Sequence, residues 1–138
     1  MMTATTIAQT TVRAIAPIII ILGLLFWTDT ATFLVPVHML LGIVIVLSLW
    51  TLALLAARAG VNLGFVALAL VWGLVVPVLG VTQERLLPGS EHWLIQILHL
   101  LVGLGAIGQA EGLARGIKAR QQPSRDQSAQ ALGTLQNP

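Results

Sequence analysis

Two histidines with matching surroundings are the residues in this sequence best suited to chemistry. Residues 37–42 read VHMLLG and residues 98–103 read LHLLVG, so Gly42 follows His38 by four residues and Gly103 follows His99 by four. Residues four apart share one helix face, so each imidazole has a gap in the side-chain wall one turn deeper. Neutral imidazole nitrogens are common metal ligands. The pattern is typical of a site for a flat ligand held by imidazole, and an imidazole pair across a helical bundle suits haem iron.

The same residues leave another interpretation open. A histidine in a membrane helix can simply hydrogen-bond a neighbouring helix. Polar side chains are costly inside a membrane, however, and tend to be functional. Two histidines in one local setting therefore favour a shared ligand. The pattern by itself does not distinguish haem from a quinone or from another metal.

Two further residues are candidates for the same site. His92 precedes His99 by seven residues and shares its helix face. His92 could replace His99 as a ligand, bond a haem propionate or line a quinone site, or it could be an interfacial residue bonded to water. Arg85 could pair with a propionate or be a solvated charge in a loop.

The elements that position these residues are predicted to be membrane-spanning helices. Hydrophobic residues make up 57% of the 138-residue chain and charged residues only 9%, against about 25% charged residues in a typical soluble domain. Each of four apolar stretches approaches the roughly 20 residues needed to cross a bilayer as a helix. These stretches are residues 12–28, 33–57, 63–81 and 93–117.

The stretches predict an all-α fold, a four-helix transmembrane bundle running up-down-up-down, because short connections favour antiparallel neighbours. The matching histidine segments are consistent with an internal repeat of two hairpins. Residues 1–118 are expected to form this domain. Residues 119–138 are rich in Gln, Ser and Pro from Gln121 onward, and we expect a mobile cytoplasmic tail there.

Charge predicts the orientation of the bundle. Six of the seven basic residues fall on one side of this topology, and Arg85 falls on the other with Asp29, Glu84 and Glu91. By the positive-inside rule, both termini are expected in the cytoplasm. Trp27 and Trp93 would lie at the outer interface. The six basic residues are Arg13, Arg58, Arg115, Lys118, Arg120 and Arg125.

Several function classes are excluded by composition. The chain contains no cysteine, so disulfides, thiolate metal sites, iron–sulfur clusters and c-type haem attachment are ruled out. The excess of basic residues is small, and no basic patch alternates with aromatic residues, so nucleic acid is not an expected partner. The lipid bilayer is the expected partner.

The fourth apolar stretch also carries a stripe of small residues and an acid. Gly105, Gly108, Gly112 and Gly116 lie almost opposite His99, and small residues at such spacing let helices approach closely. The stripe could pack on another span, on a second copy of the chain or on a different membrane subunit, and we expect an outward subunit contact. Glu111 is expected to pair with Arg115 at i+4, although an acid there could also serve proton or ion transfer.

Across its four spans the chain resembles the four-helix b-type membrane cytochromes of the cytochrome b561 kind, through His38, Gly42, His99 and Gly103. Di-haem members of that group use four histidine ligands, whereas this chain has three histidines in all. The resemblance therefore implies one haem b per chain, with His38 and His99 as axial ligands and Gly42 and Gly103 making room for the macrocycle. It implies electron exchange with a quinone or a partner redox protein. We expect the chain to lie in a prokaryotic inner membrane.

Two rival functions remain open. The chain could be a cofactor-free accessory subunit of a larger membrane complex, packing through its glycine stripe. It could also be a small transporter that uses Glu111 and the histidines. Under the leading interpretation it is an electron-transfer protein rather than a catalyst with its own substrate pocket.

Overall fold

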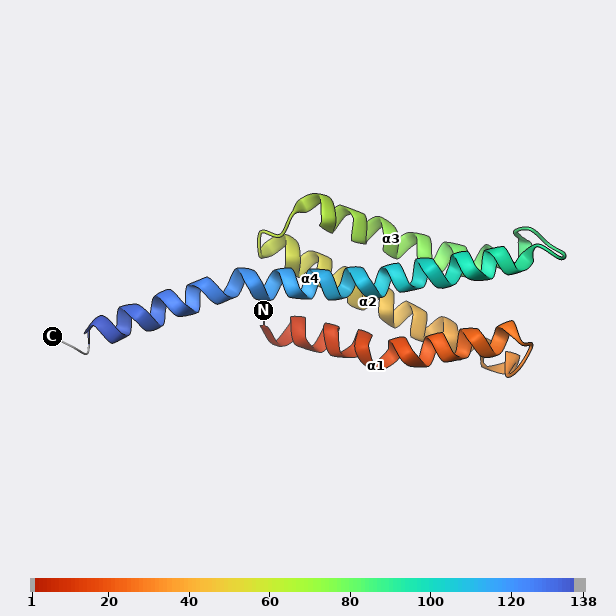
Figure 1. Cartoon of the computed structure of the whole chain (residues 1–138), viewed down its shortest axis with the longest axis horizontal. Helices are drawn as coiled ribbons and strands as arrows, with labels where there is room; N and C mark the ends of the chain where they lie inside the picture. The colour runs from red at the N-terminus through yellow and green to blue at the C-terminus, as the bar shows by residue number, and fades with distance from the viewer. Residues whose placement is uncertain (1, 136–138) are drawn as a thin grey trace.

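A computed structural model describes residues 2–135, with side chains described for residues 2–122. The four predicted helices are present, and no strand occurs among the described residues (Figure 1). Short 3-10 turns, η1 at Thr32–Leu34 and η2 at Gln83–Arg85, precede α2 and follow α3. The α-helices are α1 Met2–Trp27, α2 Val35–Arg58, α3 Leu63–Thr82 and α4 His92–Leu135.

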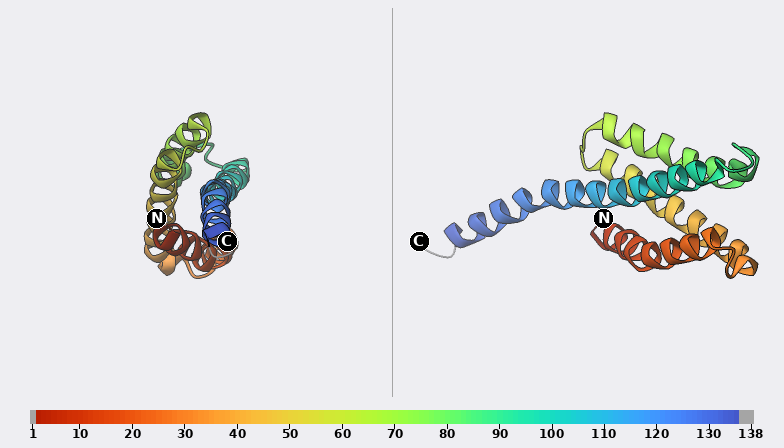
Figure 2. Two further views of the ribbon diagram at one scale, coloured as in Figure 1. Left: turned by 90° about the vertical axis from the view of Figure 1, so that its left-hand side faces the viewer. Right: turned by 45° about the vertical axis from the view of Figure 1, so that its right-hand side comes forward.

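All four helices are long and apolar enough to cross a membrane, which confirms the predicted fold class. Neighbouring helices run in opposite directions (Figure 1). Each consecutive pair packs together, and α4 returns to pack on α1. α2 and α4 also contact each other, whereas no contact joins α1 and α3 within the described part of the chain. The two histidine-bearing helices therefore face each other across the middle of the bundle (Figure 2).

Two helices are longer than the apolar stretches predict. α1 begins at Met2 rather than near Val12. α4 continues as a helix to Leu135, through most of the segment 119–138 that is expected to be a mobile tail, and it extends beyond the bundle in Figure 1. Glutamine, alanine, arginine and leucine are frequent there and are good helix formers, so low hydrophobicity alone does not end a helix. Residues 136–138 lie outside the described residues.

Local signals account for the connection between α2 and α3. Gly60 adopts a positive φ of 76° just after α2, a conformation that glycine reaches without steric cost. The Asn62 side chain then accepts hydrogen bonds from the backbone amides of Gly64, at 2.8 Å, and Phe65, at 3.2 Å. This cap satisfies two of the amides that a new helix leaves without partners, so α3 begins at Leu63.

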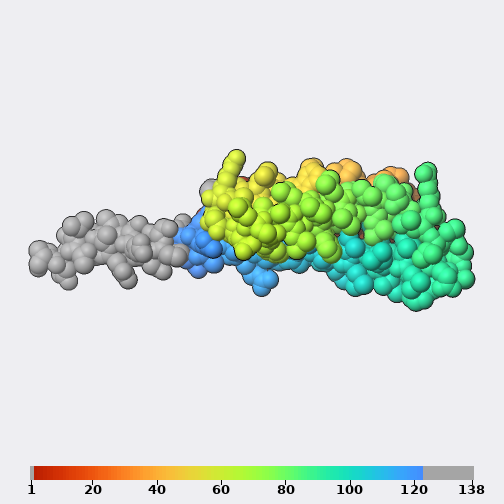
Figure 3. Space-filling view, turned by 90° about the horizontal axis from the view of Figure 1, so that it is seen from above, coloured from red at the N-terminus to blue at the C-terminus, as the bar shows by residue number. Residues whose placement is uncertain are grey.

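The tightly packed core lies in the half of the bundle that contains the N-terminus and the α2–α3 connection. Its largest fully buried apolar side chains are Val12, Leu49, Leu52, Leu113 and Ile117. Near the other end, few residues of the helices are buried, among them Leu22 and Ile95. Side chains of α3 cover much of the face seen in Figure 3, with α4 along its border. The histidine end of the bundle is therefore the less tightly packed end.

Two tryptophans pack into glycine positions on neighbouring helices. The Trp50 indole of α2 lies against Gly73 of α3 and donates a hydrogen bond of 3.1 Å to the Leu70 carbonyl. The Trp72 indole of α3 lies over Gly105 of α4 and donates to the Val102 carbonyl at 2.9 Å. In each pair, the indole ring fills the space that a larger residue at the glycine position would occupy. Each indole N–H also has a hydrogen-bond partner, as an indole packed between helices needs.

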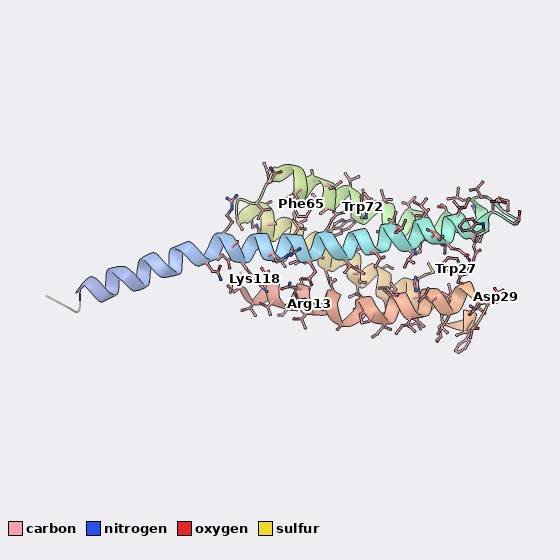
Figure 4. All side chains as sticks on the ribbon, viewed as in Figure 1. Arg13, Trp27, Asp29, Phe65, Trp72 and Lys118 are labelled. Carbon is pink, nitrogen blue, oxygen red and sulfur yellow. The ribbon has the colours of Figure 1, made fainter. Side chains whose placement is uncertain are left out.

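The glycine stripe of α4 packs largely on α3 and the residues before it. Gly105 is covered by Trp72, and Gly112 by Phe65 (labelled with Trp72 in Figure 4). Gly116 is covered by Val61. Space beside Gly108 is open, with no described atom within 4 Å of where a Cβ would lie. Three of the four positions therefore pack within the chain, and contact of the stripe with another subunit stays a prediction.

Glu111 has a different charged partner from the one that its spacing predicts. Its carboxylate accepts two hydrogen bonds of 2.7 Å from the Arg13 guanidinium of α1, which lies between α1 and α4 in Figure 4. Arg115 donates instead to the Glu111 backbone carbonyl at 3.4 Å. The expected i+4 pair is wrong because α1 packs on α4 and brings Arg13 to the level of Glu111.

Candidate functional site

His38 of α2 and His99 of α4 meet inside the bundle, near the end that carries Trp27 and the α3–α4 connection. Their ring centroids lie 6.3 Å apart, and the ring planes make an angle of 44°. The meeting follows from the fold, since α2 and α4 run in the same direction and contact each other. The structure thus brings together the two residues that the sequence selects as ligands.

Both imidazoles carry an unsatisfied nitrogen. The Nδ1 atoms of His38 and His99 are buried and have no hydrogen-bond partner among the described residues. A buried polar atom without a partner costs on the order of 1–3 kcal/mol, and most such atoms in native proteins are satisfied. Each ring therefore carries one buried nitrogen that is free to bind a ligand, and the two rings are neighbours.

A glycine of the preceding helix lies behind each imidazole. A Cβ built on Gly23 of α1 would lie 3.6 Å from Cε1 of His38, and one built on Gly80 of α3 would lie 3.3 Å from Cε1 of His99. Phe26 adds an edge-on ring contact to His38, with centroids 5.4 Å apart. Each histidine is thus held between its own helix and the helix before it.

Sequence reasoning missed Gly23 and Gly80, although a signal for them exists. In an antiparallel hairpin, residues equally far from the turn lie at about the same depth. Gly23 and His38 are equally distant in sequence from the Thr30–Ala31 bond, and Gly80 and His99 from the Gly89–Ser90 bond. Equal distance from the turn therefore indicates which glycine of the neighbouring helix lies next to each imidazole.

The glycines one turn deeper than the histidines have different surroundings. A Cβ on Gly103 would meet no described atom within 4 Å, so the predicted gap below His99 is present. A Cβ on Gly42 would lie 3.6 Å from Cδ1 of Ile19. The gap below His38 is therefore bordered by a flexible side chain of α1.

The other two predicted site residues lie away from the imidazole pair. His92 is the first residue of α4, and its Nδ1 lies 3.3 Å from the Leu86 carbonyl. Arg85 is exposed in η2, and its side chain has no hydrogen bond or ion pair among the described residues. Neither contacts the rings of His38 and His99, so the site has the two imidazoles as its centre.

The two imidazoles suit some metal centres better than others. A bare Zn²⁺ ion takes four ligands at about 2.0–2.3 Å, and the described residues contain no cluster of three or more His, Asp or Glu side chains that could hold a metal. Haem iron carries four porphyrin nitrogens and needs only axial ligands from the protein. Two imidazoles on opposite sides of one metal, each bound at about 2 Å, have ring centroids about 6 Å apart. The centroid distance of 6.3 Å between His38 and His99 agrees with that spacing.

An apolar groove of about 450 Å³ opens between α3 and α4 near this site. It includes Leu79 next to Gly80, Leu98 next to His99, and Val102. Its surface is almost wholly apolar, as expected for a surface in contact with lipid. The groove is lined by Leu74, Val75, Val78, Leu79, Thr82, Leu86, Leu98 and Val102.

Comparisons with protein-family models, with curated protein sequences and with solved structures found no match to this chain.

Proposed function

We propose that this protein is a membrane-bound b-type cytochrome that holds one haem b between α2 and α4. His38 and His99 are the axial ligands, and the cofactor lies in the outer half of the bundle. The supporting observation is the convergence of the two imidazoles, with centroids 6.3 Å apart, from helices that are adjacent in space but distant in sequence.

Three properties of the surroundings support this proposal. The buried Nδ1 atoms have no protein partner, the position beside Gly103 is open, and the tight core ends short of the histidine end. A cofactor bound through the Nδ1 atoms would satisfy them, and the open position beside Gly103 would leave room for its edge. A cofactor-free role leaves these three features without a common cause.

The chain's own residues would orient and enclose the cofactor. His38 and His99 would bind the iron from opposite sides, Gly23 and Gly80 would back the rings, and Phe26 would limit rotation of His38. A bound haem supplies reversible one-electron chemistry at its iron, at a potential tuned by ligands and burial. Two imidazole ligands leave no open axial position, which favours electron transfer over oxygen chemistry. The partner is expected to be a quinone or a redox protein.

The transporter alternative has less support. Glu111 is bonded to Arg13 and also accepts a hydrogen bond of 2.8 Å from Gln9. An acid held by two partners is less suited to carrying an ion, and the described residues place no acid beside the imidazole pair. The accessory-subunit alternative rests on the glycine stripe, most of which is covered within the chain.

Visible absorption spectroscopy tests the proposal. The protein is expressed with haem supply, purified in detergent, and its spectrum recorded after oxidation and after reduction by dithionite. We expect one haem per chain and a sharp reduced α-band, both lost in His38→Ala and in His99→Ala. A wild-type protein that is folded and colourless under these conditions overturns the proposal.

His92→Ala is the matched control, because it removes the third histidine without touching the imidazole pair. We expect the haem content and the α-band of this variant to equal those of the wild type. Loss of haem in His92→Ala with retention in His99→Ala would assign the ligand to His92 and contradict the proposed pair.

A further inference from the structure

The two glycines behind the imidazoles leave different amounts of room. The space at Gly23 would accept a methyl group at ordinary van der Waals distance, 3.6 Å from His38 Cε1. The space at Gly80 would not, because the methyl group would lie 3.3 Å from His99 Cε1. A contact that short requires the ring or the helix to shift by a few tenths of an ångström.

The shift would fall mainly on the imidazole. Gly80 lies within α3, whose position is fixed by Trp50 against Gly73 and by the Trp72 hydrogen bond to Val102. The His99 ring, by contrast, has no hydrogen bond at its Nδ1 that would hold its rotation. Rotation about the side-chain bonds of His99 is therefore the least costly response.

We propose that Gly80 is a positioning residue that sets the rotation of the His99 imidazole, and with it the 44° angle between the two rings. Gly80 touches the ring rather than any cofactor atom. As part of the proposed haem site, this role rests on the proposed function, but the placement of Gly80 against His99 does not depend on haem.

The ferric low-spin signal in electron paramagnetic resonance is a direct readout, because its g-values depend on the angle between two axial imidazole planes. We expect Gly80→Ala to shift the g-values of the haem that the variant binds, whatever its haem content. Gly23→Ala is expected to give a smaller shift. Gly108→Ala, on the same helix as His99 but with open space at its Cβ, is expected to give none.

The outcomes separate a positioning role from a general loss of stability. Unchanged g-values in Gly80→Ala overturn the inference, and so does a shift that Gly108→Ala reproduces. A shift confined to Gly80→Ala and, more weakly, Gly23→Ala supports it. Thermal unfolding of each variant is measured alongside, and a shift without a change in melting temperature is the expected result.

A second measurement works without haem. In detergent micelles, protein labelled at histidine and glycine is expected to show cross-relaxation between Hε1 of His99 and the α-protons of Gly80. Absence of this signal in a folded protein overturns the inference. Its presence in a protein that binds no haem would leave Gly80 as the support of His99 while the cytochrome proposal fails, so the two failures are distinguishable.

Discussion

Arg13 of α1 and Glu111 of α4 form a two-pronged ion pair that joins the first helix to the last, with both nitrogen–oxygen distances at 2.7 Å. Gln9 extends the contact, since its amide donates to Glu111 and accepts from the Lys118 ammonium at 2.6 Å. Gln9 is 4% exposed. The network ties α1 to α4 through side chains that are far apart in the sequence.

Glu111→Gln is expected to destabilise the bundle, because it leaves the Arg13 guanidinium without its anionic partner. We expect the free energy of unfolding in detergent to fall, although Arg13 is largely exposed and exposed ion pairs contribute little. Glu91→Gln, which neutralises an exposed acid beyond the end of the bundle, is the control and should change it by less than about 0.5 kcal/mol. Equal effects of the two variants would show that the ion pair contributes nothing.

Gly73→Ala is expected to disturb the contact between α2 and α3. Its methyl group would overlap the Trp50 indole, and overpacking of this kind costs about 1–3 kcal/mol. Unfolding monitored by tryptophan fluorescence measures the loss. Gly108→Ala adds the same methyl group where space is open and should leave the stability unchanged or raise it. A Gly73→Ala protein as stable as Gly108→Ala contradicts the packing described here.

Trp72→Phe is expected to weaken the packing of α3 on α4. It removes the indole N–H that donates a hydrogen bond of 2.9 Å to the Val102 carbonyl. Side-chain hydrogen bonds between membrane helices contribute about 0.6 kcal/mol on average and up to about 1.7 kcal/mol. The loss in unfolding free energy should fall in that range. Trp93→Phe, at an exposed position at the start of α4, is the control, and an equal loss there would contradict the assigned role of the hydrogen bond.

The orientation of the bundle is open to direct labelling, because the natural chain has no cysteine. Ser90→Cys lies in the exposed α3–α4 connection, and Ala119→Cys lies on α4 near the opposite end. A membrane-impermeant maleimide is added to intact cells, under conditions in which it reaches the outer face of the membrane. If the basic end faces the cytoplasm, it labels Ser90→Cys alone. Labelling of Ala119→Cys alone would place both termini outside.

The sequence by itself determined the membrane character, the four spans and their antiparallel order. Hydropathy and turn residues act over short stretches of chain, and lipid permits few backbone structures. The sequence also placed His38 and His99 at similar depth, because both lie a similar distance into spans that run the same way. The choice of His38 and His99 as a pair therefore followed from residues 37–42 and 98–103, and the structure brings their rings together.

Only the tertiary structure decided which side chains share a level and face each other. It paired Glu111 with Arg13 instead of Arg115, covered most of the glycine stripe from within the chain, and set Gly80 closer to its imidazole than Gly23. These relationships depend on the rotation of each helix about its own axis and on how far it extends. That rotation is fixed by the packing of all four helices together, so no local pattern of residues contains it.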